Sequence, residues 1–228
     1  MTQPARPIPP SEVDSSRGHA PAGELTYEEF LAWADEDTLA EWVDGKVIMT
    51  SPASRRHQEV MQFLFATMAP FVQVHALGKV MSPPFQMKIG QTGREPDVLF
   101  IATAHLDRLT STYLDGPADL VVEIVSPESG GRDRGDKFYE YEAAAIPEYW
   151  LIDPQRAQAD FYHLDALGRY RVTVTEVDEV YRSQVLPGFW LRTSWLWQDP
   201  LPDPVDALLE IDDAYARYLE ERLRQHQA

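Results

Sequence analysis

The sequence predicts an α/β fold, in which short buried strands alternate with helices. Two apolar runs, 96–102 and 119–125, have the length and composition of buried strands, and each carries a carboxylate. Alternating apolar residues around an Asp-Gly pair predict a β-hairpin over 40–49. A segment of helical composition, 132–145, separates the strand at 119–125 from another apolar run at 147–153, which is the order of a βαβ crossover.

Length and composition indicate one larger domain. The chain has 228 residues, of which 44% are apolar, so it can bury a sizeable core. The absence of cysteine excludes disulfides, thiolate zinc sites and cysteine nucleophiles, and it is compatible with a reducing cytoplasm. The formal charge of −17 speaks against a general polyanion-binding surface, because nucleic-acid affinity comes largely from Lys and Arg. A local basic patch is still compatible with this charge, and its candidates are Arg55, Arg56, Arg132, Arg134 and Lys137.

The chain divides into three segments. Residues 1–23 are rich in Pro, Ser and Gly and predict a flexible tail. Residues 24–200 form the domain, and residues 201–228 contain a C-terminal amphipathic helix, with its apolar stripe between 206 and 224. No apolar run approaches the roughly 18–20 residues that span a bilayer, and the N-terminus lacks the apolar stretch of a signal peptide. We therefore expect a soluble cytoplasmic protein without membrane contact.

In the N-terminal half, Thr26 and Glu29 have the spacing of a capping box, which predicts the start of a short helix. The hairpin at 40–49 comes next. The largely apolar segment 54–76 then predicts the core helix, kinked or shortened at Pro70. The strands expected after it are 79–81, 85–89, 96–102 and 119–125.

The C-terminal half predicts additional antiparallel strands. Segments 159–164 and 169–175 flank an Ala-Leu-Gly turn at 166–168, which is typical of a hairpin. Residues 180–185 add a further strand.

The two carboxylate strands indicate a cation site. Asp97 and Glu123 lie 26 positions apart, each within a run of Val, Leu and Ile. A carboxylate that leaves water for such surroundings loses several kcal/mol unless a partner compensates it, and a divalent metal is the simplest partner for two of them. Mg²⁺ prefers hard carboxylate oxygens, and the backbone carbonyl of Ile124 at the strand end is available as a third ligand.

Lys137 is the natural candidate for a catalytic cation. Phosphodiester cleavage needs a positive charge near the developing anion and the attacking water. Asp133, Lys137 and Tyr141 are four residues apart and share one helix face. If this helix packs over the carboxylate strands, the long Lys137 side chain reaches the site.

Four separated blocks of the chain resemble the Uma-type restriction endonuclease family of the PD-(D/E)XK nuclease superfamily. They span about residues 25–190 and occur in the order EWVDGKVIMTSPASRRHQ, EPDVLFIA, DLVVEIVSPES and RDRGDKFYEYEAAAIPEYWLIDP. The resemblance implies a restriction-endonuclease-like core, in which helices flank a mixed β-sheet.

The same resemblance implies the site residues. Asp97 and Glu123 correspond to the metal ligands. The superfamily lysine normally stands two residues beyond the second carboxylate, where this chain has Val125, so the role is carried to Lys137. Glu41 and His57 fall in matching blocks and lean toward the site. The implied cofactor is Mg²⁺ or Mn²⁺, and the implied substrate is DNA.

Structural roles compete with these assignments. Asp97 at the start of a strand could cap a neighbouring loop, and Lys137 could form a structural ion pair with Glu123. His57 and Glu41 could be ordinary core or surface residues. Tyr141 is expected to pack in the core. A solvated helix face is expected from Asp133, Asp136, Glu140 and Glu142.

Two functions from different classes therefore stay open. The first is a metal-dependent endonuclease that hydrolyses DNA, expected as a homodimer because duplex cutting needs two sites. The second is a catalytically inactive nuclease-fold dimer that acts as a binding or regulatory module. Glycoside hydrolysis by the carboxylate pair is less favoured, because no aromatic sugar platform accompanies it.

Overall fold

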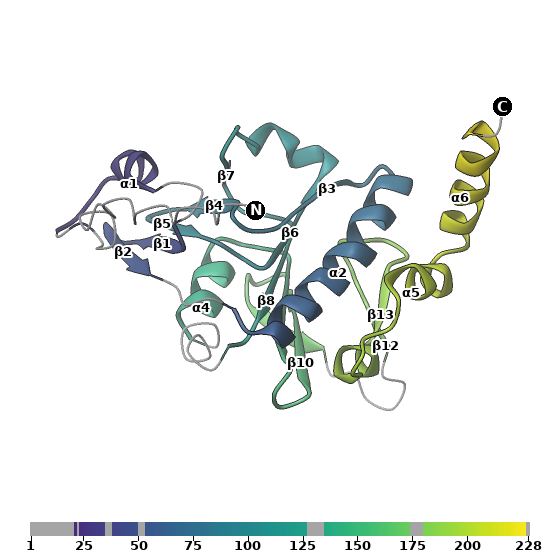
Figure 1. Cartoon of the computed structure of the whole chain (residues 1–228). Coiled ribbons are helices and arrows are strands. Elements are labelled where there is room, and N and C mark those ends of the chain that lie inside the picture. The colour runs from purple at the N-terminus through teal and green to yellow at the C-terminus, as the bar shows by residue number, and fades with distance from the viewer. Residues whose placement is uncertain are drawn as a thin grey trace, which may run out of the picture.

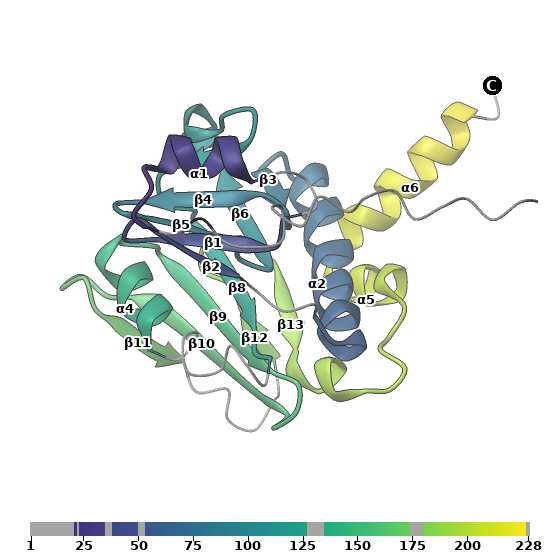
Figure 2. The ribbon, with the colours of Figure 1, turned by 60° about the vertical axis from the view of Figure 1, so that its left-hand side comes forward.

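The structure of this chain is a computed structural model that describes residues 21, 23–34, 38–49, 53–126, 135–173 and 180–226. Two sheets and the helices around them form the body, and the last helix extends away from it (Figures 1 and 2). Within the described ranges, no helix has the length and apolar character that a membrane span requires. The expected tail falls on residues 1–23, of which all but 21 and 23 lie outside the described part.

The central sheet has six strands in the order β11-β10-β9-β8-β6-β3. Only β8 and β9 run parallel, and every other neighbouring pair is antiparallel, so the sheet is mixed. The helix α4 (Asp136–Ala143) connects β8 to β9, which confirms the predicted crossover. The strand bounds are β3 (Gly78–Met81), β6 (Val98–Ala102), β8 (Leu120–Ile124), β9 (Glu148–Asp153), β10 (Gln158–Leu164) and β11 (Tyr170–Thr173).

The second sheet carries the predicted hairpin and has five strands in the order β2-β1-β5-β4-β7. Asp44 and Gly45 turn the hairpin with φ of 46° and 80°, a pair of left-handed conformations that suits a two-residue hairpin turn. The helix α1 (Tyr27–Trp33) begins with the expected capping box and packs its aromatic side chains against Trp42. The strand bounds are β1 (Ala40–Val43), β2 (Lys46–Met49), β4 (Gln86–Ile89), β5 (Thr92–Arg94) and β7 (Tyr113–Asp115).

Helices cover both faces of the central sheet, as Figure 2 shows for α2 and α4. The long helix α2 (Arg55–Val74) buries an apolar stripe against one face, and Pro70 lies inside this helix without ending it. On the other face, α4 buries Tyr141 in a second core cluster that includes Leu99 and Val121. A mixed sheet flanked by helices is therefore confirmed.

The C-terminal region differs from the single amphipathic helix that the sequence predicts. β12 (Val180–Arg182) lies within the predicted strand at 180–185 and pairs with β13 (Trp190–Arg192), but residues 201–228 contain two helices, α5 (Pro204–Ile211) and α6 (Asp213–His226). Asp212 breaks the helix because its backbone is extended and its carboxylate accepts a hydrogen bond from the Ala214 N–H. An acidic side chain that competes for backbone donors favours a helix start over a helix interior.

Three short strands, β5, β7 and β13, were not predicted. Each has three residues, too few to display an alternation of apolar and polar side chains. The predicted helix at 132–145 begins at Asp136 within the described residues, and residues 132–134 lie outside them.

Candidate active site

The two predicted carboxylates lie opposite each other at the ends of β6 and β8. Val98 pairs with Val122 in the antiparallel register, so one step further Asp97 faces Glu123. Side chains alternate between the faces of a sheet, and Leu99 and Val121 point into the core beneath α4. Glu123 therefore projects on the α4 side of the sheet, whereas Asp97, which directly precedes β6, turns its carboxylate to the end of β8.

Asp97 caps the end of β8. Its Oδ2 atom accepts a hydrogen bond of 2.6 Å from the Ile124 N–H and lies 3.2 Å from His57 Nε2. Its Oδ1 atom makes no hydrogen bond with the described residues. Because the N–H and C=O of an extended residue point to the same side, the Ile124 carbonyl also faces the Asp97 edge of the strand. Two oxygen atoms are thus available for a cation here.

Glu123 is held by two residues of α4. Its Oε2 atom lies 3.0 Å from Lys137 Nζ, and its Oε1 atom accepts a hydrogen bond of 2.6 Å from the Tyr141 hydroxyl. Only 4% of the Glu123 side chain is exposed, so the carboxylate depends on these donors. Burial raises the pKa of Tyr141 well above its usual value, and the charges of Glu123 and Glu41 add to the effect. Tyr141 therefore stays protonated and donates.

Glu41 holds Lys137 from the other side. Its Oε1 atom lies 3.2 Å from Lys137 Nζ and accepts a hydrogen bond from the Glu95 N–H, while its Oε2 atom bonds Arg94 at 3.0 Å. Burial alone would raise the pKa of Glu41, but the charges of Lys137 and Arg94 lower it below its usual value. Glu41 is consequently a buried anion between two cations.

The structure brings all five predicted site side chains into one region. Glu41, Glu123 and Lys137 contact one another through the lysine amine, and His57 contacts Asp97. His57 reaches Asp97 from the first turn of α2, where Ser54 caps the helix by accepting from the His57 N–H. The expected Lys137–Glu123 pair is present, and this geometry accommodates both the catalytic and the structural interpretation of Lys137.

Sequence reasoning missed Arg94 and misjudged Glu140. Arg94 is 1% exposed and makes two hydrogen bonds to Glu140, of 2.8 and 2.6 Å. Glu140 was expected on a solvated face with Glu142, but both carboxylates are paired, because Glu142 binds Arg169 and the Tyr170 N–H. Arg94 lies in a strand of three residues, which is too short to leave a periodic signal in the sequence. Only the fold therefore reveals its pair with Glu140.

Glu95 is a further acidic group near the site. Burial raises its pKa to about 7; a hydrogen bond from Gln86 and the Lys137 charge oppose the rise, whereas the Glu41 charge adds to it. Near neutral pH this carboxyl is therefore shared between its protonated and ionised forms. Glu95 lies between Arg94 and Pro96, directly before the predicted strand at 96–102, and no role in the site was predicted for it from the sequence.

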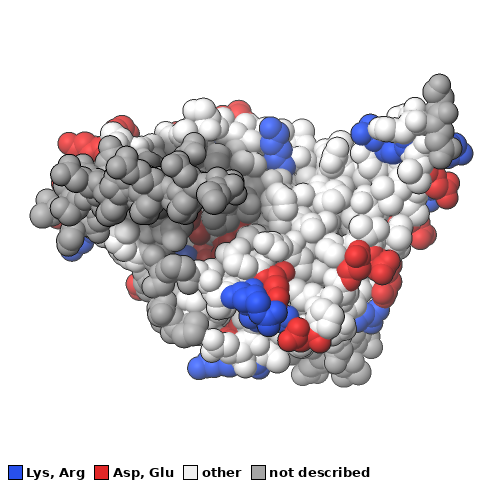
Figure 3. All heavy atoms as spheres, in the orientation of Figure 1, with Lys and Arg blue, Asp and Glu red and all other residues white. Residues whose placement is uncertain are grey.

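The expected basic patch is only partly supported by the described residues. Arg56 donates two hydrogen bonds of 2.8 Å to the carbonyls of Leu196 and Gln198, so it anchors the C-terminal region. Arg55 is 74% exposed beside Glu59. Arg132 and Arg134 lie outside the described part of the chain. On the face in Figure 3, basic side chains occur in small groups beside acidic ones.

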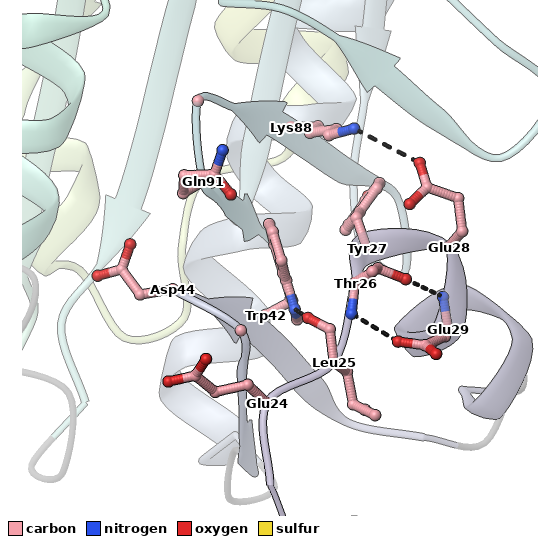
Figure 4. Close-up of a pocket in the computed structure, with 12 residues that line it drawn as sticks. Glu24, Leu25, Thr26, Tyr27, Glu28, Glu29, Trp42, Asp44, Lys88 and Gln91 are labelled. Atoms are coloured by element: carbon pink, nitrogen blue, oxygen red, sulfur yellow. Dashed lines mark hydrogen bonds and ion pairs between the residues drawn. The ribbon is translucent and has the colours of Figure 1, made fainter.

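A separate depression of about 680 Å³ lies between α1 and the hairpin sheet. Figure 4 shows the Thr26–Glu29 capping bonds at its edge, with Lys88 pointing to Glu28 and Trp42 bonding the Leu25 carbonyl. None of the five candidate site residues lines this depression, so we do not connect it with their chemistry.

The oxygen atoms of Asp97, Glu123 and the Ile124 carbonyl are of the type that binds a divalent cation, but they are few. Two carboxylates and a carbonyl offer the hard oxygens that Mg²⁺ and Mn²⁺ prefer. Within the described residues there is no group of three or more His, Cys, Asp or Glu side chains arranged to hold a metal ion. Water and substrate oxygens would have to complete the coordination.

The mixed sheet, its flanking helices and the acid pair on neighbouring strands define a nuclease-like α/β protein. The chain belongs to the Uma2 family, described as "Putative restriction endonuclease", whose model matches residues 27–194. The resemblance drawn from the four sequence blocks is thereby confirmed.

Two similar proteins, one known from its sequence and one from its crystal structure, match this chain. The "Uncharacterized protein slr1290" of Synechocystis sp. is 27% identical over 154 residues, which are 63% of this chain and 76% of that protein. A crystal structure described as a putative nuclease belonging to DUF820, from Anabaena variabilis ATCC 29413, matches with a TM-score of 0.66. The match covers 76% of this chain and 97% of that one at 17% identity, so it supports the fold alone.

Proposed function

We propose that this protein is a metal-dependent endonuclease that hydrolyses DNA phosphodiester bonds with Mg²⁺ or Mn²⁺. One observation carries the proposal: Asp97 binds the Ile124 N–H directly beside Glu123, and the Lys137 amine lies 3.0 Å from the Glu123 carboxylate. Membership of the Uma2 family supports the same reaction class.

The charge balance of the site supports a divalent cation. Among the described residues, four carboxylates, those of Glu41, Asp97, Glu123 and Glu140, accompany two permanent cations, Arg94 and Lys137. These six described groups carry an excess of two negative charges before Glu95 is counted. Buried charge of one sign is costly unless a counter-ion compensates it.

In this proposal each residue has a distinct task. A cation held by Asp97, Glu123 and the Ile124 carbonyl would withdraw charge from the scissile phosphate and lower the pKa of the attacking water. Lys137 donates a hydrogen bond that stabilises the negative charge developing on the phosphoryl oxygens. The water oxygen bonds to phosphorus as the bond to the leaving oxygen breaks, while the attacking water releases a proton to solvent and the leaving oxygen takes up a proton from solvent. His57 orients Asp97, and Glu41 orients Lys137.

The test is a cleavage assay on single-stranded, duplex and branched DNA with Mg²⁺ or Mn²⁺. We expect cleavage that EDTA abolishes. Asp97→Asn and Glu123→Gln should each lower the rate at least about 100-fold, because each removes a charge that organises the reaction. Glu210→Gln is a matched control, since this exposed carboxylate pairs with Arg192 away from the site. Cleavage that both site variants retain unchanged would contradict the assignment.

The alternative proposal is an inactive nuclease-fold dimer that binds a partner. The observation in its favour is that protein donors already engage both Glu123 oxygens, on a chain of net charge −17. Thermal unfolding with millimolar Mg²⁺ or Mn²⁺ separates the two, because a ligand of the native state must raise its apparent stability. A melting temperature that neither ion changes, in a protein that does not cleave DNA, would favour the inactive module.

Both proposals include a homodimer, since symmetric dimers are the commonest oligomers and duplex cutting needs two sites. Light scattering coupled to size exclusion measures the mass in solution. A mass near twice 26.0 kDa is expected.

A further inference from the structure

We propose that Arg94 is a positioning residue that keeps the Lys137 amine beside Glu123. The inference rests on the proposed function, because it assigns Arg94 the task of holding the cation that the reaction uses. Nothing in the sequence pattern of residues 92–94 assigns a role to this side chain.

Arg94 joins two carboxylates from separate parts of the fold. Its Nε and one terminal nitrogen donate to the two oxygens of Glu140 at 2.8 and 2.6 Å, and the other terminal nitrogen donates to Glu41 at 3.0 Å. The side chain is 2% exposed. A planar guanidinium matches such a two-oxygen acceptor better than an ammonium does.

These contacts reach Lys137 by two routes. Glu140 stands three residues after Lys137 on α4 and one residue before Tyr141, so fixing Glu140 fixes the turn that carries both Glu123 donors. Glu41 contacts Lys137 with the oxygen that Arg94 does not use. Arg94 thus restrains the helix and the counter-ion of the amine together.

The second route matters most when Glu123 binds a cation. A cation bound by Glu123 would compete with Lys137 for that carboxylate, and Glu41 would then be the contact that retains the amine in the site. Glu41 can do so because Arg94 and the Glu95 N–H hold its carboxylate in place. Without Arg94, Glu140 loses its two guanidinium hydrogen bonds and Glu41 loses one of the groups that hold it, so the helix and the counter-ion are both less restrained.

The experiment compares Arg94→Met with Arg169→Met. Arg169 is the matched control, because it also pairs with a glutamate of α4, Glu142, but its side chain is 67% exposed and does not contact Glu41. The first readout is the ¹³C signal of the lysine ε-carbons in metal-free protein. The chain has four lysines, Lys46, Lys79, Lys88 and Lys137, so the signal of Lys137 is assigned by its loss in Lys137→Met.

We expect Arg94→Met to move the Lys137 signal toward those of the exposed Lys46 and Lys79 and to narrow it, and Arg169→Met to leave it unchanged. The second readout is turnover, where Arg94→Met should lower kcat about 100-fold with little change in KM, as expected for a misplaced catalytic group. Arg94→Lys should not restore either property, since an ammonium cannot make the paired contacts.

The outcomes distinguish this inference from the proposed function. An unchanged Lys137 signal in folded Arg94→Met overturns the role of Arg94, whether or not the protein cleaves DNA. If Arg94→Met displaces the Lys137 signal but the wild-type protein never cleaves DNA, the role of Arg94 is supported and the endonuclease proposal is contradicted. If circular dichroism finds Arg94→Met unfolded, the same measurements on Glu140→Met decide, because this variant keeps the Arg94–Glu41 contact and removes both hydrogen bonds from Arg94 to α4.

Discussion

Lys137 lies between two buried carboxylates and supplies a counter-charge to both, although Glu41 also pairs with Arg94. Its amine is 3.0 Å from Glu123 and 3.2 Å from Glu41, and its side chain is 8% exposed. Breaking a buried pair from one side is costly because it leaves an uncompensated charge, whereas replacing both partners with apolar groups is often neutral. Comparing the free energies of unfolding of variants that change Lys137 alone, or Lys137 together with Glu123, therefore measures how this ion pair affects the stability of the fold.

Lys137→Met should lower the free energy of unfolding by about 3–5 kcal/mol, because Glu123 and Glu41 both lose a partner. The double variant Lys137→Met/Glu123→Leu should recover much of that loss, since the second change removes one of the two stranded charges. Urea unfolding at neutral pH measures both. A double variant as unstable as the single one would show that the ion pair is required for packing.

A second buried cluster makes the stability depend on pH. His163 Nε2 lies 2.8 Å from the Tyr181 hydroxyl, which donates to the fully buried Glu148, and His163 Nδ1 lies 3.9 Å from Glu148. Burial lowers the pKa of His163 below its usual value, against the raising effect of the Glu148 charge. The folded state therefore binds a proton at this residue less readily than the unfolded state.

His163→Gln should weaken the pH dependence of stability. As pH falls through about 6.5, the unfolded chain takes up a proton that folded His163 refuses, so the free energy of unfolding of the native chain decreases. Urea unfolding at pH 7.5 and pH 5.5 measures the decrease in both proteins. An equal decrease in the two would place the pH dependence elsewhere in the chain.

The sequence reveals the residues of this site unevenly. Asp97 and Glu123 stand out because a carboxylate in an apolar strand is unusual, and Lys137 because helix spacing aligns it with Tyr141. Arg94 stands in Thr-Gly-Arg-Glu, a composition that also suits an exposed turn. Its partners are 46 and 53 residues away, and pairing at that distance is decided by the fold.

At the scale of elements, the link between α5 and α6 shows how one residue divides a helix. Asp212 accepts from the Ala214 N–H and from His75 at the end of α2, where its Oδ2 lies 2.9 Å from His75 Nε2. The same carboxylate therefore begins α6 and fixes it to the core helix. The apolar periodicity continues across the break, which is why the sequence pattern merged the two helices.

Asp212→Ala should loosen α6 selectively. Losing a helix N-cap costs about 1 kcal/mol, and the contact to His75 is lost as well. Hydrogen exchange should accelerate in residues 213–226 and stay unchanged in the central sheet. Asp206→Ala is the control, because Asp206 is exposed in the first turn of α5. Equal protection of α6 in both variants would argue against the Asp212 link.

The longer elements were predictable, whereas of the three-residue strands only β12 was. The hairpin at 40–49, the core helix and the β8–α4–β9 crossover each have a strong apolar period or turn signal. The strands β5 and β7 owe their existence to their neighbours in the sheet, β1 and β4. Tertiary pairing of this kind overrides local preference and is not encoded in a short window.

For the whole molecule, the charge of −17 limits how DNA could be held. Contacts to DNA phosphates come from Lys and Arg side chains. The Lys and Arg side chains in the described part of the site are largely paired with carboxylates. Arg55 is exposed two residues before His57, which makes it a candidate contact. We therefore expect few phosphate contacts, and an affinity that depends on the site cation.

The salt dependence of DNA binding tests this expectation. For cleavage-deficient Asp97→Asn, log Kd plotted against log salt should have a slope of no more than about 3, because each phosphate contact contributes about 0.9. Arg55→Ala should reduce that slope by about 1, whereas Arg222→Ala on the exposed end of α6 should not. Fluorescence anisotropy measures the slope, and a value of about 6 or more would reveal a basic surface that these contacts do not explain.

Fold class, topology of the crossover and the acid pair were thus accessible from the amino-acid pattern, because each depends on periodicity or on an unusual residue in an apolar run. The strand order of the second sheet and the contacts of Arg94 could not be predicted from the sequence, because they depend on segments that are distant in the chain and meet only in the folded structure.

The order of the site residues along the chain also bears on biosynthesis. A polypeptide leaves the ribosome N-terminus first, so Asp97 and Glu123 emerge before Lys137. Any unfinished product that stops before Lys137 lacks the ammonium altogether. Under the proposed reaction, incomplete translation would release acidic fragments unable to damage the genome of the cell that makes them.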